Sequence, residues 1–372
     1  MVFRSRLREK SRSGEIMKRV DSNVVDVGGV KIGGNNPVVV QSMTNTPTEE
    51  VEKTLTQIRS LVERGCELVR VAVPDSEAGE ALPEIVHRSP IPVVADIHYS
   101  PDLAFMALEA EVDKLRLNPG NITDPKAIED IAWKASSRSI PIRVGVNSGS
   151  LDKDIVEKYG RSPEAMVVSA EREIRLLKNQ GFDQIVVSLK ASEVNKTIEA
   201  NEIFSRKYDY PLHLGVTEAG GGRSGLIKSA IGIGALLREG IGDTVRVSLT
   251  GDPEEEVAAA YDILKALEIR TRGVDFVSCP TCGRTEIDVQ ALGRELEKRL
   301  ADLEDPVRVS LMGCSVNGIG EAGSSDLGLV GTARGGVLYV GGEQKGLISA
   351  SDIETVVSRM EQEIRNYLEK GD

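Results

Sequence analysis

The sequence predicts an α/β protein in which a (β/α)8 TIM barrel is followed by a small α+β domain. Three observations predict this fold. The chain has 372 residues, which is too long for one small core. Short apolar runs alternate with helical patterns from about residue 38 to about residue 270, as in parallel βα units. Beyond this region the alternation stops, and a mixed pattern of strands and helices begins.

The alternating region contains the apolar runs that we expect to form the barrel strands. Helical patterns fill the gaps, for example over residues 48–64, 163–179 and 254–267. Eight βα units fit a closed barrel better than an open doubly wound sheet, and no GxGxxG fingerprint follows the first strand. In chain order, the expected strands are Val38–Ser42, Glu67–Val73, Pro92–Ile97, Lys114–Asn118, Pro141–Asn147, Gln184–Lys190, Leu212–Thr217 and Thr244–Leu249.

Polar side chains occur at the carboxyl ends of these strands, where a TIM barrel has its active site. Four of the otherwise apolar strands are interrupted by an arginine, and any single one could form an internal ion pair with a barrel carboxylate. Because the pattern recurs and a lysine joins it, we expect the mouth to bind an anion, with phosphate or diphosphate matching the planar guanidinium. The predicted binding residues are Arg70, Asp96, Arg116, Asn118, Arg143, Asn147, Lys190, Arg246 and Ser248.

The segment "TEAGGGRSG" follows the seventh expected strand. Its glycines could present backbone N–H groups to an oxyanion at the start of the next helix, although many such runs are plain loops. Glu218 lies beside them, which makes its carboxylate the best candidate for an acid/base residue in the mouth.

Charge and hydropathy limit the possible partners. The formal net charge is −12, although basic residues dominate the first nineteen positions, so the remainder of the chain is strongly acidic and unsuited to nucleic acid. No apolar stretch is long enough to span a membrane, and no signal peptide is present, so we expect a cytoplasmic protein without membrane contact. We expect residues 1–19 to form a disordered basic leader, residues 20–270 the substrate-binding barrel, and residues 271–372 the second domain.

The second domain begins with "FVSCPTCGRT", residues 276–285. We expect a helix over residues 286–303, a strand at "VRVSLMG", a Gly-rich turn, short strands around residues 327–330 and 337–340, and a closing helix over residues 351–370.

The chain has four cysteines, and three of them lie in this second domain. Cys66 lies between a helix and a strand, where we expect a buried thiol. A structural zinc site needs four Cys or His ligands, but no histidine follows His213. A thioredoxin-like redox pair would leave one of the three cysteines unused. Three thiolates and a carboxylate best suit one 4Fe–4S cluster per subunit, with one iron held by an exchangeable oxygen ligand. The predicted ligands are Cys279, Cys282, Cys314 and Glu321.

The expected anion site in the barrel and the expected cluster in the second domain together predict a reductase that acts on a phosphorylated, oxygenated small molecule. The last barrel helix should end on the face opposite the mouth, so a subunit's own cluster domain would have difficulty reaching its own active site. We therefore expect a head-to-tail homodimer in which each cluster domain caps the partner's barrel.

Seven strings carry a family resemblance: "VVVQSMTNT", "KLRLNPGN", "IRVGVNSGSL", "LHLGVTEAG", "IGIGALLREGIGDTVRVSLTGDP", "CPTCGRT" and "GCSVNGIGEA". In combination they closely resemble the 4-hydroxy-3-methylbut-2-enyl diphosphate synthase family, also called GcpE, in its bacterial two-domain form. The resemblance runs from about Lys18 to the C-terminus.

The resemblance implies an iron–sulfur oxidoreductase of the non-mevalonate isoprenoid pathway. It implies reductive ring opening and dehydration of 2-C-methyl-D-erythritol 2,4-cyclodiphosphate to the hydroxymethylbutenyl diphosphate, with two electrons from flavodoxin or ferredoxin. Cys279, Cys282, Cys314 and Glu321 match the family's cluster ligands, and Glu218 matches its acid/base residue. The alternatives are a zinc-dependent barrel lyase or hydrolase acting on a phosphorylated small molecule, and an iron–sulfur regulator.

Overall fold

The computed structural model describes residues 19–98, 100–117, 124–349 and 352–370. The chain divides into two compact units between Leu267 and Glu268. The expected basic leader lies outside the described residues except for Arg19, whose guanidinium contacts the Asp243 carboxylate. No helix in the described part of the chain is long and apolar enough to cross a membrane.

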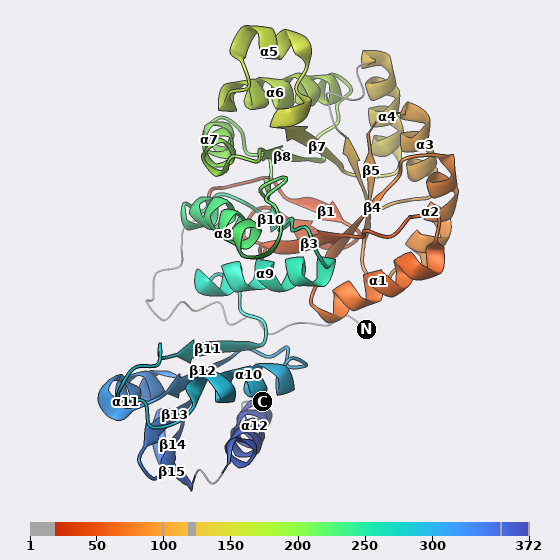
Figure 1. Ribbon diagram of the computed structural model, residues 1–372. Helices are drawn as coiled ribbons and strands as arrows, with labels where there is room; N and C mark the ends of the chain where they lie inside the picture. Colours follow the sequence, from red (N-terminus) through yellow and green to blue (C-terminus); the bar gives the residue numbers. More distant parts are fainter. Residues whose placement is uncertain (1–18, 99, 118–123, 350–351, 371–372) are drawn as a thin grey trace. The chain divides into compact units, whose positions relative to one another are not determined.

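The first unit contains an eight-stranded parallel sheet in the order β8-β7-β6-β5-β4-β3-β10-β9. A parallel bridge between Val187 and Leu212 joins its two ends, and the Val187 N–H donates to the Pro211 carbonyl over 2.9 Å. The sheet is therefore the TIM barrel that the sequence predicts (Figure 1). Its strands are β3 (Val39–Met43), β4 (Leu68–Ala72), β5 (Val93–Ile97), β6 (Lys114–Leu117), β7 (Ile142–Asn147), β8 (Ile185–Lys190), β9 (His213–Leu214) and β10 (Thr244–Val245).

Strands β9 and β10 are shorter than expected, because the chain leaves the sheet at the mouth. The Leu249 N–H, which we expected to lie in a strand, donates to the Glu256 carboxylate over 2.9 Å. This bond satisfies the backbone donor with a helix side chain in place of a neighbouring strand.

Helices surround the barrel (Figure 1), and four of the nine named below begin at a residue whose side chain caps the first turn. Ser162 accepts a hydrogen bond from the Ala165 N–H over 3.1 Å and is followed by a proline, which is a favourable start for a helix. Asp75 and Asp252 cap their helices in the same way. The helices are α1 (Val51–Glu63), α2 (Ser76–Arg88), α3 (Pro101–Glu109), α4 (Pro125–Ser137), α5 (Lys153–Tyr159), α6 (Pro163–Asn179), α7 (Val194–Ser205), α8 (Gly222–Arg238) and α9 (Pro253–Ala266).

A short antiparallel hairpin, β1 (Val25–Val27) and β2 (Val30–Ile32), was not expected from the sequence. Its apolar side chains form one buried cluster with Val39, Leu68 and Val186 of the barrel. At the hairpin turn, a Cβ on Gly28 would lie 2.3 Å from the Asp113 carboxylate, directly before β6. The hairpin therefore closes the amino-terminal end of the barrel, opposite the mouth. Each fully buried Val or Ile there contributes about 2 kcal/mol of apolar burial.

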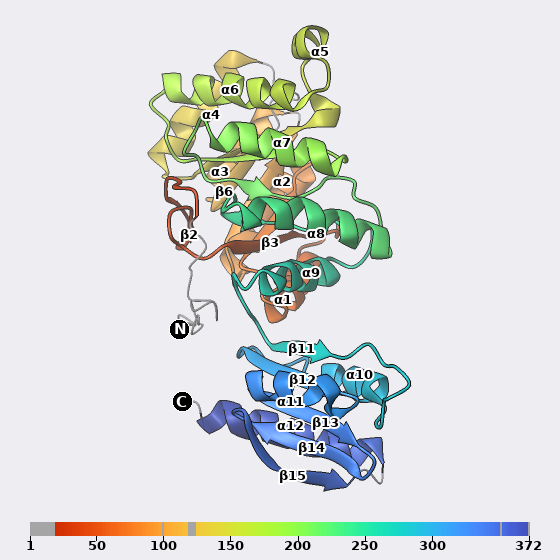
Figure 2. The same ribbon diagram turned by 90° about the vertical axis from the view of Figure 1, so that its left-hand side faces the viewer.

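The second unit is a five-stranded sheet in the order β11-β12-β13-β14-β15, in which the first three strands are parallel and the last two antiparallel (Figure 2). Apolar residues of α10 and α12 pack on one face of the sheet. Helix α11 packs on the other face, where its Ala322 lies against Gly328. The elements are β11 (Val274–Ser278), α10 (Val289–Arg299), β12 (Val307–Met312), α11 (Ser315–Ser324), β13 (Leu327–Thr332), β14 (Gly335–Val340), β15 (Glu343–Ser349) and α12 (Ile353–Lys370).

The prediction of a Gly-rich turn after β12 is wrong, because this segment forms helix α11. Glycine has a low helix propensity, so the sequence signal favours a loop. The structure explains at least one of these glycines by packing. A Cβ on Gly318 would lie 2.6 Å from Val330 Cγ1, so the glycine allows the helix to lie close against β13.

Candidate active site

Asp96, at the carboxyl end of β5, joins two of the predicted arginines. Arg116 Nη1 donates to Asp96 Oδ1 over 2.8 Å, and Arg70 Nε lies 3.6 Å from Oδ2. Burial raises the pKa of Asp96, but the charges of Arg70 and Arg116 outweigh burial and hold this pKa well below its usual value. The ionised carboxylate is thus positioned to orient the two guanidinium groups, whereas a direct contact with an anion would be repulsive.

His98 extends this cluster at the rim of the mouth. Its Nε2 lies 3.3 Å from Asp96 Oδ2 and 2.9 Å from Arg116 Nη1. A hydrogen bond from His98 also lowers the pKa of Asp96.

Arg246 is held by a helix carboxylate that we did not single out from the sequence. Its Nη2 lies 3.1 Å from Glu256 Oε2, and its Nη1 donates to the Ser248 hydroxyl. Glu256 is 4% exposed and also accepts a hydrogen bond from the Ser42 hydroxyl over 3.3 Å. In the sequence it is one of three adjacent glutamates in the first turn of α9, and only the burial of that helix face distinguishes it.

Arg143 and Lys190 are buried without the carboxylate partners that Arg116 and Arg246 have. Arg143 is 1% exposed, and its Nε and Nη1 have no hydrogen-bond partner among the described residues. Burial, together with the neighbouring positive charges, lowers the pKa of both side chains well below their usual values. A buried unpaired cation costs several kcal/mol, so the mouth is poised to accept a negatively charged ligand.

The register brings two arginines together on neighbouring strands. Arg116 of β6 is paired directly with Arg143 of β7. Like charges at such a position repel each other, and an anion bound between them would offset this repulsion by attracting both.

Two glycines make room for these cations, and we did not single them out from the sequence. A Cβ on Gly145 would lie 2.6 Å from Arg116 Nε, and a Cβ on Gly215 would lie 2.6 Å from Lys190 Nζ. Neither glycine has a positive φ, so the space they leave is the physical reason for a glycine here. The signal was present in "IRVGVN" and "LHLGVT", where a glycine interrupts an apolar strand.

Glu218 lies in the turn after β9 and is exposed. Its φ of 48° lies in the left-handed region, which costs energy for a residue with a side chain. The turn leads into α8, whose N-cap is Gly221, so free backbone N–H groups lie a few residues from this carboxylate. Glu218 is thus a strained acidic residue three positions before the N-cap of a helix.

The remaining predicted mouth residues are only partly described. Asn147 ends β7, is half-buried, and is paired in register with Lys190 at the end of β8. Ser248 is half-buried and contacts Arg246, as described above. Asn118 lies outside the described residues.

The three cysteines of the second unit lie at the carboxyl ends of its parallel strands. Cys279 follows β11, and its Sγ accepts a hydrogen bond from the Gly313 N–H over 3.1 Å. Cys314 follows β12 and is the N-cap of α11, where the helix dipole favours a thiolate. Cys282 is exposed in the intervening turn, and Glu321 lies in the last turns of α11. By contrast, Cys66 is buried and burial raises the pKa of its thiol to about 12.

The donor chemistry at this edge fits an iron–sulfur cluster, but the ligands are not gathered into a closed shell. An N–H···S bond and a helix N-terminus are the groups that stabilise cluster thiolates. Over the described ranges, however, no three Cys, His, Asp or Glu side chains are arranged closely enough to hold a metal ion. The ligand set therefore stays a prediction.

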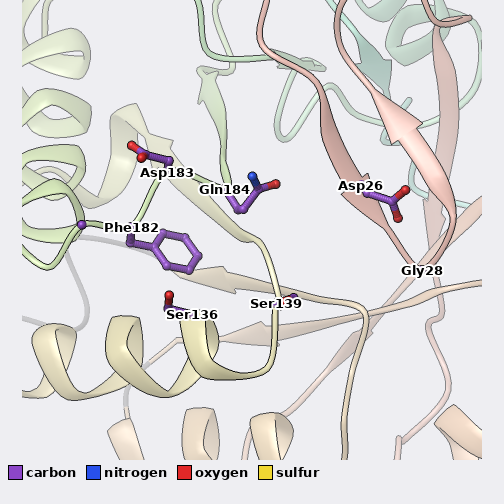
Figure 3. A pocket seen from close by; sticks show the side chains of 8 residues that line it. Asp26, Gly28, Ser136, Ser139, Phe182, Asp183 and Gln184 are labelled. Atoms are coloured by element: carbon purple, nitrogen blue, oxygen red, sulfur yellow. The ribbon is translucent and has the colours of Figure 1, made fainter.

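A cavity of about 590 Å³ lies at the other end of the barrel (Figure 3). Its lining comes from the β1–β2 turn and from the loops before β7 and β8, which mark the amino-terminal ends of the strands. Among the described residues, Asp26 and Asp183 are its charged side chains, and no described arginine or lysine lines it. It is thus unsuited to the anion that the mouth attracts.

The fold and the barrel mouth together define the class of protein, which is a TIM-barrel enzyme for an anionic substrate. Its second domain carries three cysteines near the carboxyl ends of two parallel strands. The family model described as "GcpE TIM-barrel domain" matches residues 22–261, and the one described as "GcpE protein C-terminal domain" matches residues 275–366. The chain belongs to the GcpE family.

Similar proteins agree with this assignment. A protein of Persephonella marina is 53% identical over 329 residues, which cover 88% of this chain and 94% of the relative. Proteins of Clostridium tetani and Geobacillus kaustophilus are each 48% identical, covering 94% and 96% of this chain and 100% and 95% of the relatives. All three are named "4-hydroxy-3-methylbut-2-en-1-yl diphosphate synthase (flavodoxin)". These names do not support a zinc-dependent lyase or an iron–sulfur regulator.

Proposed function

We propose that this chain is an oxidoreductase that converts 2-C-methyl-D-erythritol 2,4-cyclodiphosphate into 4-hydroxy-3-methylbut-2-enyl diphosphate. The observation that carries the proposal is the match of both units to one family, at about half identity over most of the chain. The basic side chains of the barrel mouth support it independently, because among the described residues that are not exposed they outnumber the carboxylates and so favour a negatively charged ligand.

The reaction takes up two electrons and two protons and releases one water. Ring opening breaks a carbon–oxygen bond to a phosphate, and the diphosphate then remains attached through its other end. In our proposal Arg70, Arg116, Arg143, Lys190 and Arg246 hold the diphosphate throughout, so that the leaving oxygen stays bound as its negative charge develops. Asp96 and Glu256 keep three of these cations oriented.

Glu218 is the proposed proton donor. Water can leave from the substrate only if its hydroxyl oxygen receives a proton. Glu218 is exposed at the mouth and held in a strained turn, which supports this role.

Cys279, Cys282, Cys314 and Glu321 are the proposed ligands of a 4Fe–4S cluster. When bound, such a cluster supplies electrons one at a time and offers one iron as a Lewis acid. The N–H···S bond to Cys279 and the helix N-terminus at Cys314 support thiolate ligation. Glu321 adds a harder ligand that exchanges more readily than a thiolate.

Flavodoxin is the proposed electron donor, because the names of the relatives end in the word flavodoxin. The proposed assembly is a head-to-tail homodimer, in which each second unit serves the partner's mouth. Helix α9 supports this arrangement, since it runs back from the mouth toward the amino-terminal ends of the strands, and the first unit ends directly after it.

Genetic complementation tests the proposed function. The chain is expressed in a bacterium that lacks its own synthase and survives only on an alternative isoprenoid source. We expect growth without that source for the wild-type chain, and no growth for Glu218→Gln, which keeps the size of the side chain and removes its proton. Failure of the wild-type chain, expressed and loaded with iron, would contradict the proposal.

A further inference from the structure

Lys114 is a buried cation that the proposed mechanism does not use. It is the first residue of β6 and is 0% exposed. Its Nζ has no hydrogen-bond partner among the residues that the structure describes. Because side chains alternate along a strand, Lys114 shares the barrel-interior face with Arg116, one layer deeper than the mouth.

The groups around Lys114 are basic or neutral. Arg70 of β4 and Arg143 of β7 act on it with positive charge, and Lys114 in turn acts on His213 of β9. Asp96, one layer higher on β5, already contacts both Arg70 and Arg116.

Other polar atoms in this deeper layer also lack partners. Gln41 Oε1 of β3 and His213 Nε2 of β9 are buried without a hydrogen-bond partner within the described ranges. Together with Lys114 of β6, three strands thus place unsatisfied polar atoms beneath the mouth, where a charge bound above them would act on all three.

The charge balance of the barrel explains what this layer can do. Among the described side chains of the mouth and the layer below it that are not exposed to solvent, the basic ones are Arg70, Arg116, Arg143, Arg246, Lys114 and Lys190, and the carboxylates are Asp96 and Glu256. An ammonium at Lys114 has no counter-ion there. Burial without a hydrogen-bond partner and the positive charges of Arg143 and Arg70 all disfavour the ammonium form, and they hold the pKa of Lys114 well below its usual value.

We propose that Lys114 is a positioning residue of the anion site, which takes a proton from solvent when a diphosphate occupies the mouth and then acts as a second tier of positive charge beneath it. The inference rests on the proposed function, because the anion is taken to be the cyclic diphosphate. Its two charges would offset the repulsion from Arg70 and Arg143, and the proton would pass from bulk water to Nζ without any other bond being made or broken.

Calorimetry measures this proton directly. The holoenzyme, prepared without oxygen or reductant so that no turnover occurs, is titrated at about pH 7.5 with the cyclic diphosphate in buffers of different ionisation enthalpy. Each phosphorus of this ligand carries one strongly acidic hydroxyl, so the ligand itself does not titrate near neutral pH. We expect the wild-type protein to take up about one proton per site.

Two variants assign the proton to a residue. Lys114→Met should lose most of the uptake and bind the ligand about ten-fold more weakly, whereas Lys126→Met, on the surface of α4 with its side chain 80% exposed, should match wild type. Circular dichroism and iron content show whether each variant is folded and loaded.

The outcomes separate this inference from the function on which it rests. No binding heat with the wild-type protein would overturn both. Binding without proton uptake by the wild-type protein would overturn the inference alone, and this result does not depend on any variant folding. Uptake that survives in Lys114→Met but disappears in Lys190→Met would also overturn it, because the proton would then belong to the upper tier.

Discussion

Single residues in the barrel mouth show which parts of the site a sequence can reveal. The arginines were predictable, because a charged residue in an apolar strand is conspicuous and its position at the strand end indicates the mouth. Glu256 and Lys114 were not, since one lies in a run of acidic residues and the other begins a strand, where polar residues are common. Which side chains are buried together depends on register and helix rotation, which the local pattern does not contain.

Gly145→Ala tests the claim that a strand glycine makes room for Arg116. The added methyl would lie 2.6 Å from Arg116 Nε, so the guanidinium must move away from Asp96. We expect kcat/KM for the cyclic diphosphate to fall at least ten-fold, a loss of about 1.4 kcal/mol of transition-state binding. Gly149→Ala is the matched control, because no atom of the described residues lies within 4 Å of its added methyl. Equal activities of the two variants would contradict the claim.

At the scale of elements, helix boundaries followed local signals well where a cap and a proline were present. Helix α6 was predicted with its observed bounds, because Ser162 and Pro163 mark its start. Helix α11 was missed, because its glycines favour a loop by propensity and only packing against β12 and β13 makes it a helix. The hairpin β1–β2 was missed because its three-residue strands are too short to show a period.

Gly318→Ala tests the packing of α11 and its link to the cysteines. The added methyl would lie 2.6 Å from Val330 Cγ1, which forces α11 and Cys314 at its N-cap away from the sheet. We expect a loss of about 1–3 kcal/mol in stability and a lower iron and sulfide content per chain. Gly320→Ala lies in the same helix with open space around it and should bind iron and sulfide as the wild type does. A fully loaded Gly318→Ala would count against cluster ligation by Cys314.

Helix α6 also carries a buried carboxylate that makes stability depend on pH. Burial and Asp152 raise the pKa of Glu173 from 4.5 to about 7. The folded protein therefore keeps a proton that the unfolded chain loses, and the free energy of unfolding should decrease as pH rises from about 4.5 to about 7.

Glu173→Gln removes this titration. We expect the variant to be more stable than wild type by on the order of 2 kcal/mol at about pH 8, and nearly unchanged at about pH 4. Urea unfolding at both pH values measures the difference, with Glu157→Gln, on the exposed surface of α5, as the control. A variant no more stable than wild type at the higher pH would show that Glu173 is not buried as described.

For the whole molecule, the fold class follows from the count of alternating units, and the family follows from strings distributed over both units.

The proposed assembly depends on how two copies share their domains, and mixing inactive subunits tests it. One parent carries Cys279→Ser and the other Glu218→Gln. In a head-to-tail dimer, each mixed dimer has one intact pair of barrel and cluster domain, so we expect up to half of the wild-type activity per mixed dimer. Mixtures as inactive as both parents would contradict the shared site.

The central claim is that this chain reduces the cyclic diphosphate with electrons that arrive through its cysteine-bearing unit. Anaerobic turnover with reduced flavodoxin, followed by mass spectrometry of the products and by the oxidation of flavodoxin, tests it most directly. We expect one molecule of 4-hydroxy-3-methylbut-2-enyl diphosphate for every two electrons consumed, and no product from Cys282→Ser. Electron consumption without this product, or product formation by the cysteine variant at the wild-type rate, would contradict it.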